Sequence, residues 1–320
     1  MILTVTRACD LRCSYCPTAK DGWPALTPDD ARHAVTLFAE RYGGGDLKLF
    51  GGEPLLVPDV VRAAMEAARN RPEIRRVYLS TNGLGLNADW VDYLKGYNKG
   101  ILTISMDGRP EDHRRMRRTL PGVADSYDHL MSLRTALLTV PRLVITQTIP
   151  PATAGWAAEN FQHLISLGFY RFNLLPGYYI PWKSRQITAL SASFDAIRGI
   201  IENRWLSGRH LYLRNLFTRA PTPFFNTGFV VDADRTIHPS NIGLSGTLDH
   251  LRTQTTIGTL DDPPTPEALT EKAAAINGML QEALPERVWQ STMAVDAELT
   301  RLCRSLYPAL RRYRKNRGAA

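Results

Sequence analysis

The sequence predicts an α/β fold, a partial (β/α)6 TIM-like barrel followed by a C-terminal α+β extension. Up to about residue 180, short apolar or β-branched runs alternate with longer segments of helical periodicity, as in a parallel sheet. The first four of these runs are each followed by cysteine, glycine or polar residues. This alternation of strand-like and helical segments ends near residue 182, so we expect a barrel at 1–182 and an extension at 183–320.

Six runs are predicted as the strands of the barrel, at residues 2–6, 47–50, 76–80, 101–105, 143–149 and 170–175. Between them we expect helices, several of which begin with proline, aspartate or serine, at 28–42, 57–70, 88–96, 125–138 and 156–167. The carboxyl ends of parallel strands meet at one rim, where folds of this class hold their active sites. The polar residues that follow the strands should therefore converge there.

The extension is predicted to begin with a long helix at about 190–205 and to continue with a β-hairpin at 224–240. The hairpin should turn at Asp232–Arg235, where turn-forming residues separate two strand-like runs. Two further helices are expected at 265–283 and 285–313. A partial barrel leaves its mouth exposed, so we expect the extension to cap it.

Length, composition and charge describe a folded protein of enzyme size. Of the 320 residues, 44% are hydrophobic and 22% are charged, which is close to the globular average. The first residues do not resemble a signal peptide and no apolar run is long enough to span a membrane, so we expect a cytoplasmic protein without a membrane partner. The net charge of +8 is concentrated at 113–118 and 311–317. Solvated helix faces explain it more simply than a nucleic-acid or acidic-peptide surface, because no nucleic-acid motif accompanies it.

Three of the four cysteines lie close together, at Cys9, Cys13 and Cys16. In a reducing compartment such a group is more typical of metal binding or catalysis than of disulfides. A [4Fe–4S] cubane usually takes four thiolates, one per iron, so three would leave one iron open to a cofactor or substrate. Zinc is an alternative, although zinc ligands usually come as two separated pairs. Cys303 is expected to be an isolated buried cysteine.

The pattern CxxxCxxC, with Tyr15 before the third cysteine, resembles the signature of the radical S-adenosylmethionine (radical SAM) enzymes. The resemblance implies a single [4Fe–4S] cluster on Cys9, Cys13 and Cys16, with S-adenosylmethionine (AdoMet) on the open iron. It also implies reductive cleavage of AdoMet to methionine and a 5′-deoxyadenosyl radical, which abstracts hydrogen from a substrate carbon. A reductant such as flavodoxin or ferredoxin is then a required partner.

Further motifs of the same family follow the next strands and imply contacts with AdoMet. "FGGEP" at 50–54 resembles the family's GGEP motif, in which the backbone of the glycines and the glutamate carboxylate receive the methionine amino group. The resemblance implies this role for Gly51, Gly52, Glu53 and Pro54. "STNG" at 80–83 matches residues that contact the ribose and adenine, and so implies roles for Ser80 and Asn82.

One branch of the family, the sulfatase-maturing enzymes and peptide maturases, binds the methionine carboxylate with a serine and an arginine that match Ser105 and Arg117. Arginine suits this role because its paired donors match a carboxylate. Gln147 lies on the fifth predicted strand, and Asn173 and Leu175 lie on the sixth. Side chains alternate between the two faces of a strand, and we expect these three to point toward the barrel mouth. An equal alternative for these three is a purely structural place in the core or in a loop.

Relatives in this branch often carry a cysteine-rich C-terminal domain, called SPASM, whose hairpin ends in a cysteine that ligates extra clusters. Residues 228–240 resemble that hairpin, but His238, Pro239 and Ser240 stand where the cysteine would fall. The auxiliary-cluster cysteines are missing, which predicts one cluster only. We expect the segments 178–185, 213–217 and 226–240 either to bind substrate or to form a purely structural cap; the candidate contacts are Tyr178, Tyr179, Arg214, Asn226 and His238.

The resemblance favours a peptide side chain as the substrate, modified by crosslinking, epimerisation or oxidation. The chain begins directly with the first strand and offers no N-terminal module to hold a leader peptide, so a separate peptide-recognition protein is a candidate partner. For the same reason a small metabolite is an alternative substrate. An alternative of another class is a non-catalytic iron–sulfur binding or regulatory protein, against which the methionine-binding motifs argue.

Overall fold

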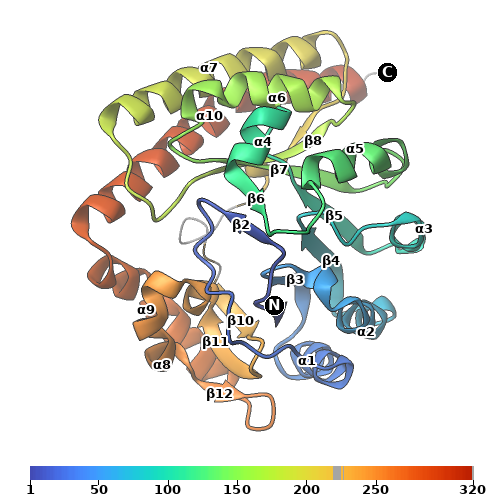
Figure 1. Ribbon diagram of the computed structural model, residues 1–320, viewed down its shortest axis with the longest axis vertical. Coiled ribbons are helices and arrows are strands. Elements are labelled where there is room, and N and C mark those ends of the chain that lie inside the picture. The colour runs from blue at the N-terminus through green and yellow to red at the C-terminus, as the bar shows by residue number, and fades with distance from the viewer. Residues whose placement is uncertain (219–224, 226, 319–320) are drawn as a thin grey trace. The chain divides into compact units, whose positions relative to one another are not determined.

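The computed structural model describes residues 1–218, 225 and 227–318, which form two compact units (Figure 1). Each unit is built from several stretches of chain. The first unit comprises Met1–Ile104, Arg117–Leu143 and Ala220–Ala283, and the second comprises Ser105–Met116, Val144–Arg219 and Leu284–Ala320. The extension therefore contributes to both units, and a functional division at 182/183 remains a prediction.

The first unit is centred on a sheet in which the central strands are parallel. β1 (Ile2–Thr6) pairs with β3 (Gly45–Gly51), which is followed by β4 (Ile74–Thr81) and β5 (Gly100–Ser105). All five residues of β1 are buried, as expected for a parallel strand covered on both faces. On its other edge β1 pairs in parallel with β10 (Thr227–Val231), and the antiparallel strands β11 (Thr236–Ser240) and β12 (Gly258–Thr259) complete the sheet.

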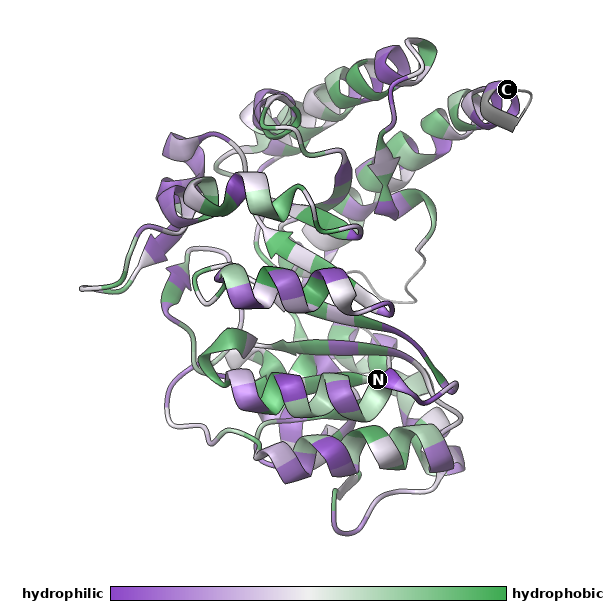
Figure 2. Ribbon diagram, turned by 90° about the vertical axis from the view of Figure 1, so that its right-hand side faces the viewer, coloured by the Kyte–Doolittle hydropathy of each residue, from purple (hydrophilic) through white to green (hydrophobic). Residues whose placement is uncertain are grey.

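Amphipathic helices surround this sheet, and their sequence signals agree with their observed ends. They are α1 (Pro28–Arg41), α2 (Pro58–Arg69), α3 (Ala88–Gly96), α5 (Ser126–Leu137), α8 (Arg252–Thr255) and α9 (Pro266–Ala283). Thr27 and Asp30 form a capping box at the start of α1, and Asn87 and Asp125 cap α3 and α5. Figure 2 shows hydrophilic and hydrophobic residues alternating along the helices.

A short antiparallel ribbon, not predicted from the sequence, also belongs to the first unit. It pairs β2 (Leu11–Cys13) with β6 (Arg117–Thr119), and in its register Cys13 lies opposite Arg117. Three-residue strands give too short an alternation to be recognised from a pattern of period two.

The second unit contains three parallel strands, β7 (Leu143–Ile149), β8 (Arg171–Pro176) and β9 (Tyr212–Leu213). Its helices are α4 (Pro110–Met116), α6 (Ala157–Ser166), α7 (Ser184–Leu206) and α10 (Glu286–Gly318). α10 packs along α7, where Arg301 on α10 pairs with Asp195 on α7 at 2.7 Å. Short 3₁₀ helices complete both units, at η1 (Pro54–Leu56), η2 (Ala154–Trp156), η3 (Arg214–Leu216), η4 (Asn241–Leu244) and η5 (Gly246–Leu251).

The six predicted barrel strands and five intervening helices are all present, with bounds that differ by a few residues at most. The hairpin turns at 232–235 as expected, and Arg235 adopts a left-handed φ of 71° there. Among the predicted elements the largest difference in bounds is at α7, which begins at Ser184 instead of about 190 because its first turn is polar and lacks apolar periodicity. Among the described residues, no helix is both long enough and apolar enough to cross a membrane.

Candidate functional site

The three clustered cysteines lie in a loop that leaves the carboxyl end of β1. The loop begins with a turn in which the Ala8 amide donates to Thr6 Oγ1 at 3.2 Å. Its middle is held by β6, which pairs with β2, and a tight turn brings the Cys16 amide to 3.1 Å from the Cys13 carbonyl oxygen. All three thiols are half-buried, whereas Cys303 is buried in α10. The loop therefore presents three accessible thiols from a backbone anchored at several points.

The far side of the cysteine loop is fixed by the segment that follows β11. The Gly246 amide donates to the Pro17 carbonyl at 2.9 Å, and the Ala19 amide donates to the Leu244 carbonyl at 3.0 Å. Between these bonds, Thr18 and Ser245 form an isolated antiparallel bridge. A segment of the extension thus positions the loop that carries the predicted cluster ligands.

Arg117 and Tyr15 flank the thiols. Arg117 Nη1 lies 4.0 Å from Cys13 Sγ, and its guanidinium carbon lies 5.5 Å from the centre of the Tyr15 ring. Burial raises the pKa of the Cys9 thiol to about 12, partly offset by a hydrogen bond from the Leu11 amide. Cys9 is consequently a thiol in the free protein, and it loses its proton when a metal binds.

The GGEP turn packs directly on the backbone of the cysteine loop. The Gly52 amide donates to the Thr6 carbonyl at 2.9 Å, and the Glu53 amide donates to the Ala8 carbonyl at 2.8 Å. A Cβ atom on Gly51, whose φ is 150°, would lie 2.0 Å from the Thr6 oxygen, and one on Gly52 would lie 2.2 Å from the Ala8 oxygen. Both positions therefore require glycine for this close approach.

Glu53 is buried, with 1% of its surface exposed, and it joins the ends of β3 and β4. Its carboxylate accepts hydrogen bonds from the Leu55 amide at 3.0 Å, the Thr81 hydroxyl at 2.7 Å and the Asn82 amide at 2.7 Å. Burial raises its pKa to about 7 despite these bonds. A carboxylate has about four acceptor sites, so one remains for a ligand such as an amino group.

Asn82 connects β4 to the cysteine loop. Its Nδ2 donates to Asp10 Oδ1 at 2.6 Å, and its own Oδ1 accepts from the Leu84 amide at 2.9 Å. Sequence reasoning overlooked Asp10, although an aspartate directly beside the first cysteine was a visible signal. Ser80 is half-buried on β4, where it pairs with Thr103 on β5. Pro54 begins η1 and is buried. Contacts of Ser80, Asn82 and Pro54 with AdoMet remain predictions.

The other predicted cofactor contacts, Ser105, Gln147 and Leu175, belong to the second unit. Gln147 is 1% exposed and donates through Nε2 to the Ala157 carbonyl at 3.0 Å, so its amide supports the packing of α6. Ser105 and Leu175 are half-buried at the ends of β5 and β8. Their roles toward AdoMet remain predictions.

The predicted substrate contacts are distributed over both units. Tyr178 donates to Asp296 at 2.9 Å, and the Tyr179 amide donates to the Thr292 hydroxyl at 2.9 Å, so both tyrosines are tied to α10. Arg214 is half-buried at the start of η3. Asn226 lies outside the described residues. His238 belongs to the first unit and is 2% exposed.

The ring of His238 is held by two hydroxyl groups. Nε2 lies 2.8 Å from Thr236 Oγ1, and Nδ1 lies 3.4 Å from Thr255 Oγ1. Burial lowers the pKa of His238 to about 4. This environment is that of a buried, neutral residue with internal partners, and the structure gives no support to the predicted substrate contact.

A buried charge cluster that sequence reasoning missed joins the start of the cysteine loop to the β10–β11 hairpin. Arg7 is fully buried; its Nε donates to Asp232 Oδ1 at 3.1 Å, and its guanidinium stacks 3.5 Å from the centre of the Trp23 ring. The guanidinium carbon of Arg252 lies 4.8 Å from the centre of the same Trp23 ring, and Arg252 pairs with Asp234. Buried ion pairs therefore connect the hairpin to the start of the cysteine loop.

The residues present fit an iron–sulfur cluster. Within the described ranges, no three His, Cys, Asp or Glu side chains lie close enough together to hold a single metal ion. Three half-buried thiols on one anchored loop are the kind of donors that a [4Fe–4S] cubane takes, one per iron.

Comparison with known proteins agrees with this geometry. Residues 3–146 match the radical SAM superfamily, whose members use a [4Fe–4S] cluster and AdoMet. The chain is 34% identical over 117 residues to a GTP 3′,8-cyclase from Paenarthrobacter nicotinovorans, covering 35% of this chain and 32% of that enzyme. It is 36% identical over 122 residues to an AdoMet-dependent heme synthase from Methanosarcina barkeri, covering 37% and 34%. The chain thus spans about a third of the length of the curated relatives it matches.

Solved structures show a similar fold over more of the chain. The structure of anSMEcpe with bound AdoMet and the Cp18Cys peptide has a TM-score of 0.76 at 16% identity and covers 98% of each chain. Streptococcus suis SuiB bound to its precursor peptide SuiA has a TM-score of 0.61 at 12% identity, covering 86% of this chain and 65% of that one. These likenesses confirm the predicted fold class, an α/β protein with a mostly parallel sheet and a partial barrel.

Proposed function

We propose that this chain, whose residues 3–146 form a radical SAM domain, is an enzyme that cleaves AdoMet reductively and removes a hydrogen atom from a carbon of its substrate. The observation that carries the proposal is the direct attachment of the GGEP turn to the cysteine loop, through Gly52 and Glu53. A protein that only carried a cluster would not need a carboxylate with one free acceptor site beside its thiols.

When bound to Cys9, Cys13 and Cys16, a single [4Fe–4S] cluster would supply the electron for cleavage of AdoMet and the radical chemistry that follows. The chain's own residues hold the reactants in place. Glu53 fixes the ends of β3 and β4 and keeps an acceptor for the methionine amino group, and Arg117 is the candidate partner of the methionine carboxylate. These charge-assisted contacts would orient AdoMet without taking part in bond cleavage.

We propose a peptide side chain as the substrate. Support comes from the likeness in fold to structures that hold peptides, and from the motifs at Ser105 and Arg117. A small metabolite is the second candidate, favoured by the identity with GTP 3′,8-cyclases over the N-terminal part of the chain. In both cases a reductant such as flavodoxin or ferredoxin would supply the electron, and a peptide substrate could be delivered by a separate recognition protein.

The proposal is tested by AdoMet turnover in the anaerobically reconstituted, reduced protein. We expect 5′-deoxyadenosine to form, slowly without substrate and faster with it. Short peptides encoded beside the gene and GTP are then compared as substrates, and mass spectrometry identifies the product. Acceleration by GTP alone would favour the small-metabolite function. A reconstituted protein that binds a cluster but forms no 5′-deoxyadenosine under any of these conditions would contradict the enzymatic proposal.

A further inference from the structure

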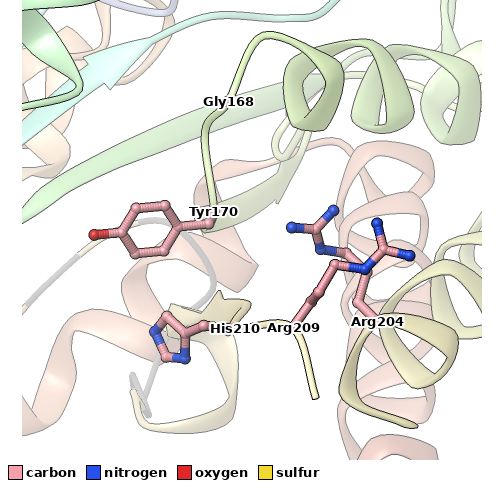
Figure 3. A pocket seen from close by; sticks show the side chains of 5 residues that line it. All are labelled: Gly168, Tyr170, Arg204, Arg209 and His210. Carbon is pink, nitrogen blue, oxygen red and sulfur yellow. The ribbon is translucent and has the colours of Figure 1, made fainter. Parts of the chain in front are cut away.

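The second unit contains a cavity of about 460 Å³, widely open to solvent, where α7 ends and β8 begins (Figure 3). Gly168 and Tyr170, between α6 and β8, form one part of its lining, and Arg204, Arg209 and His210 form the rest. A neighbouring cavity of about 220 Å³ shares Arg204 and Arg209. None of these residues belongs to the cofactor motifs.

Two arginines dominate this lining, and their guanidinium groups lie next to each other in Figure 3. Within the described part of the chain, neither Arg204 nor Arg209 has a carboxylate partner. Arg204 is half-buried, and its Nε is shielded from solvent without a hydrogen-bond partner. Burial and the neighbouring Arg209 charge both lower the pKa of Arg204. Two like charges in one cavity repel each other, and an anion between them would turn this repulsion into attraction.

The end of α7 opposes an anion less here than an uncapped helix end would. Its last carbonyl groups could do so, since a helix carries partial negative charge at its C-terminus. Three of the last four accept from backbone donors: the Ser207 amide bonds to the Asn203 carbonyl at 3.1 Å, and the Gly208 amide bonds to the Trp205 carbonyl at 3.1 Å. The Arg209 amide closes the turn by donating to the Arg204 carbonyl at 2.9 Å.

The opposite side of the cavity is lined by two aromatic rings, one of which is held by contacts with residues behind it. The rings of Tyr170 and His210 lie 5.4 Å apart at 60°, and Tyr170 is 37% exposed. His210 Nδ1 lies 3.3 Å from the hydroxyl of Tyr313 on α10, and the Tyr313 ring stacks on Trp205 at 5.8 Å. The aromatic wall therefore has a fixed position relative to the two arginines.

We propose that this cavity binds a small phosphorylated molecule, with Arg204 and Arg209 holding the phosphate and the Tyr170–His210 pair contacting an attached ring. Guanidinium groups match phosphate oxygens through paired donors, and a phosphate alone would leave most of a 460 Å³ cavity unfilled. The cavity lies at the amino end of β8, the end opposite to the one where parallel-barrel enzymes hold their reacting groups. The ligand is accordingly an effector or a recognition group, and this inference is independent of the proposed function.

Calorimetric titration of the reconstituted full-length protein with pyrophosphate tests whether Arg204 and Arg209 bind phosphate. We expect saturable binding that weakens as salt is raised, and that weakens about ten- to a hundredfold in Arg204→Gln and in Arg209→Gln. Arg287→Gln is the matched control, because Arg287 is an exposed arginine at the other end of α10 and should leave the affinity unchanged. Circular dichroism checks that the variants remain folded.

A second titration, with uridine 5′-monophosphate, tests the aromatic wall. Tyr170→Ala should weaken this nucleotide about fivefold or more while leaving pyrophosphate affinity unchanged, since a base can stack but pyrophosphate cannot. The proposal is overturned if the wild-type protein binds neither probe. It is also overturned if the arginine variants bind like Arg287→Gln, or if Arg117→Ala in the first unit removes the binding instead.

Discussion

Two regions of the first unit, the cysteine loop and the β10–β11 hairpin, use polar residues in opposite ways. In the loop, Cys9, Cys13 and Cys16 are half-buried. In the hairpin, Asp232 and His238 are almost fully buried and have partners within the protein. Half-buried thiols on an anchored loop are suited to binding a ligand, whereas buried groups that pair with one another are suited to holding a structure together.

The difference matters because the hairpin resembles a SPASM hairpin in which cysteines would ligate an auxiliary cluster. In this chain the corresponding region is held by ion pairs of Arg7 and Arg252 and by the bonds of the following segment to Pro17 and Ala19. The hairpin therefore acts on the cofactor site indirectly, by holding the cysteine loop.

The largest expected effect concerns the loop itself. Replacing Cys9, Cys13 and Cys16 together by alanine should lower the iron content of the reconstituted protein from about four per chain, the content of one cubane, to none. Cys303→Ala is the control and should retain the full content, because this cysteine is buried in α10 and lies outside the cysteine loop. Iron and sulfide analysis measures both. Eight irons per wild-type chain would show that the hairpin region binds a cluster after all.

The next effect concerns the buried ion pair of the hairpin. Asp232→Asn should destabilise the protein by about 3–5 kcal/mol, because it leaves the Arg7 charge buried without its partner. Urea unfolding of the variant measures this loss. Asp261→Asn provides the control, since Asp261 pairs with Arg235 at the protein surface and should contribute no more than about 1 kcal/mol. Equal stability of the two variants would mean that the buried cluster does not fix the hairpin.

A smaller effect is expected at the AdoMet motifs. Arg117→Ala should weaken AdoMet binding by about 1.5–3 kcal/mol, or about ten- to a hundredfold, through loss of one charge-assisted contact. The cluster's absorption should persist, because Arg117 contacts the loop through its side chain and is no cluster ligand. Arg118→Ala is the control, because Arg118 is the exposed neighbour of Arg117 on β6. Unchanged AdoMet affinity in Arg117→Ala would remove this residue from the proposed site.

Much of the first unit could be predicted from the sequence because strong local signals coincide there. The strands are apolar runs, and caps such as Thr27 and Asn87 mark the helix starts. The ribbon of β2 and β6 and the pairing of Arg7 with Asp232 could not be predicted, because they join residues more than a hundred positions apart. Glu53 was recognised by its motif, but its hydrogen bonds to the end of β4 depend on tertiary packing alone.

The smallest effect is a change in stability with pH, to which His238 in the hairpin and Glu53 beside the cysteine loop contribute in opposite directions. Burial lowers the pKa of His238 from 6.5 to about 4, so the folded protein binds fewer protons at this residue than the unfolded chain between these pH values. The contribution of His238 to the free energy of unfolding is present above pH 6.5 and should fall by about 1–2 kcal/mol between pH 7 and 5. Glu53 acts in the opposite direction, because its raised pKa, about 7, favours the folded state as the pH falls toward 4.5. Comparison of urea unfolding for wild type and His238→Asn isolates the histidine: the difference in stability between the two proteins should shrink as the pH falls to 5. A difference that stays constant from pH 7 to 5 would show that His238 is accessible to protons in the folded protein, which would return it to the candidates for substrate contact.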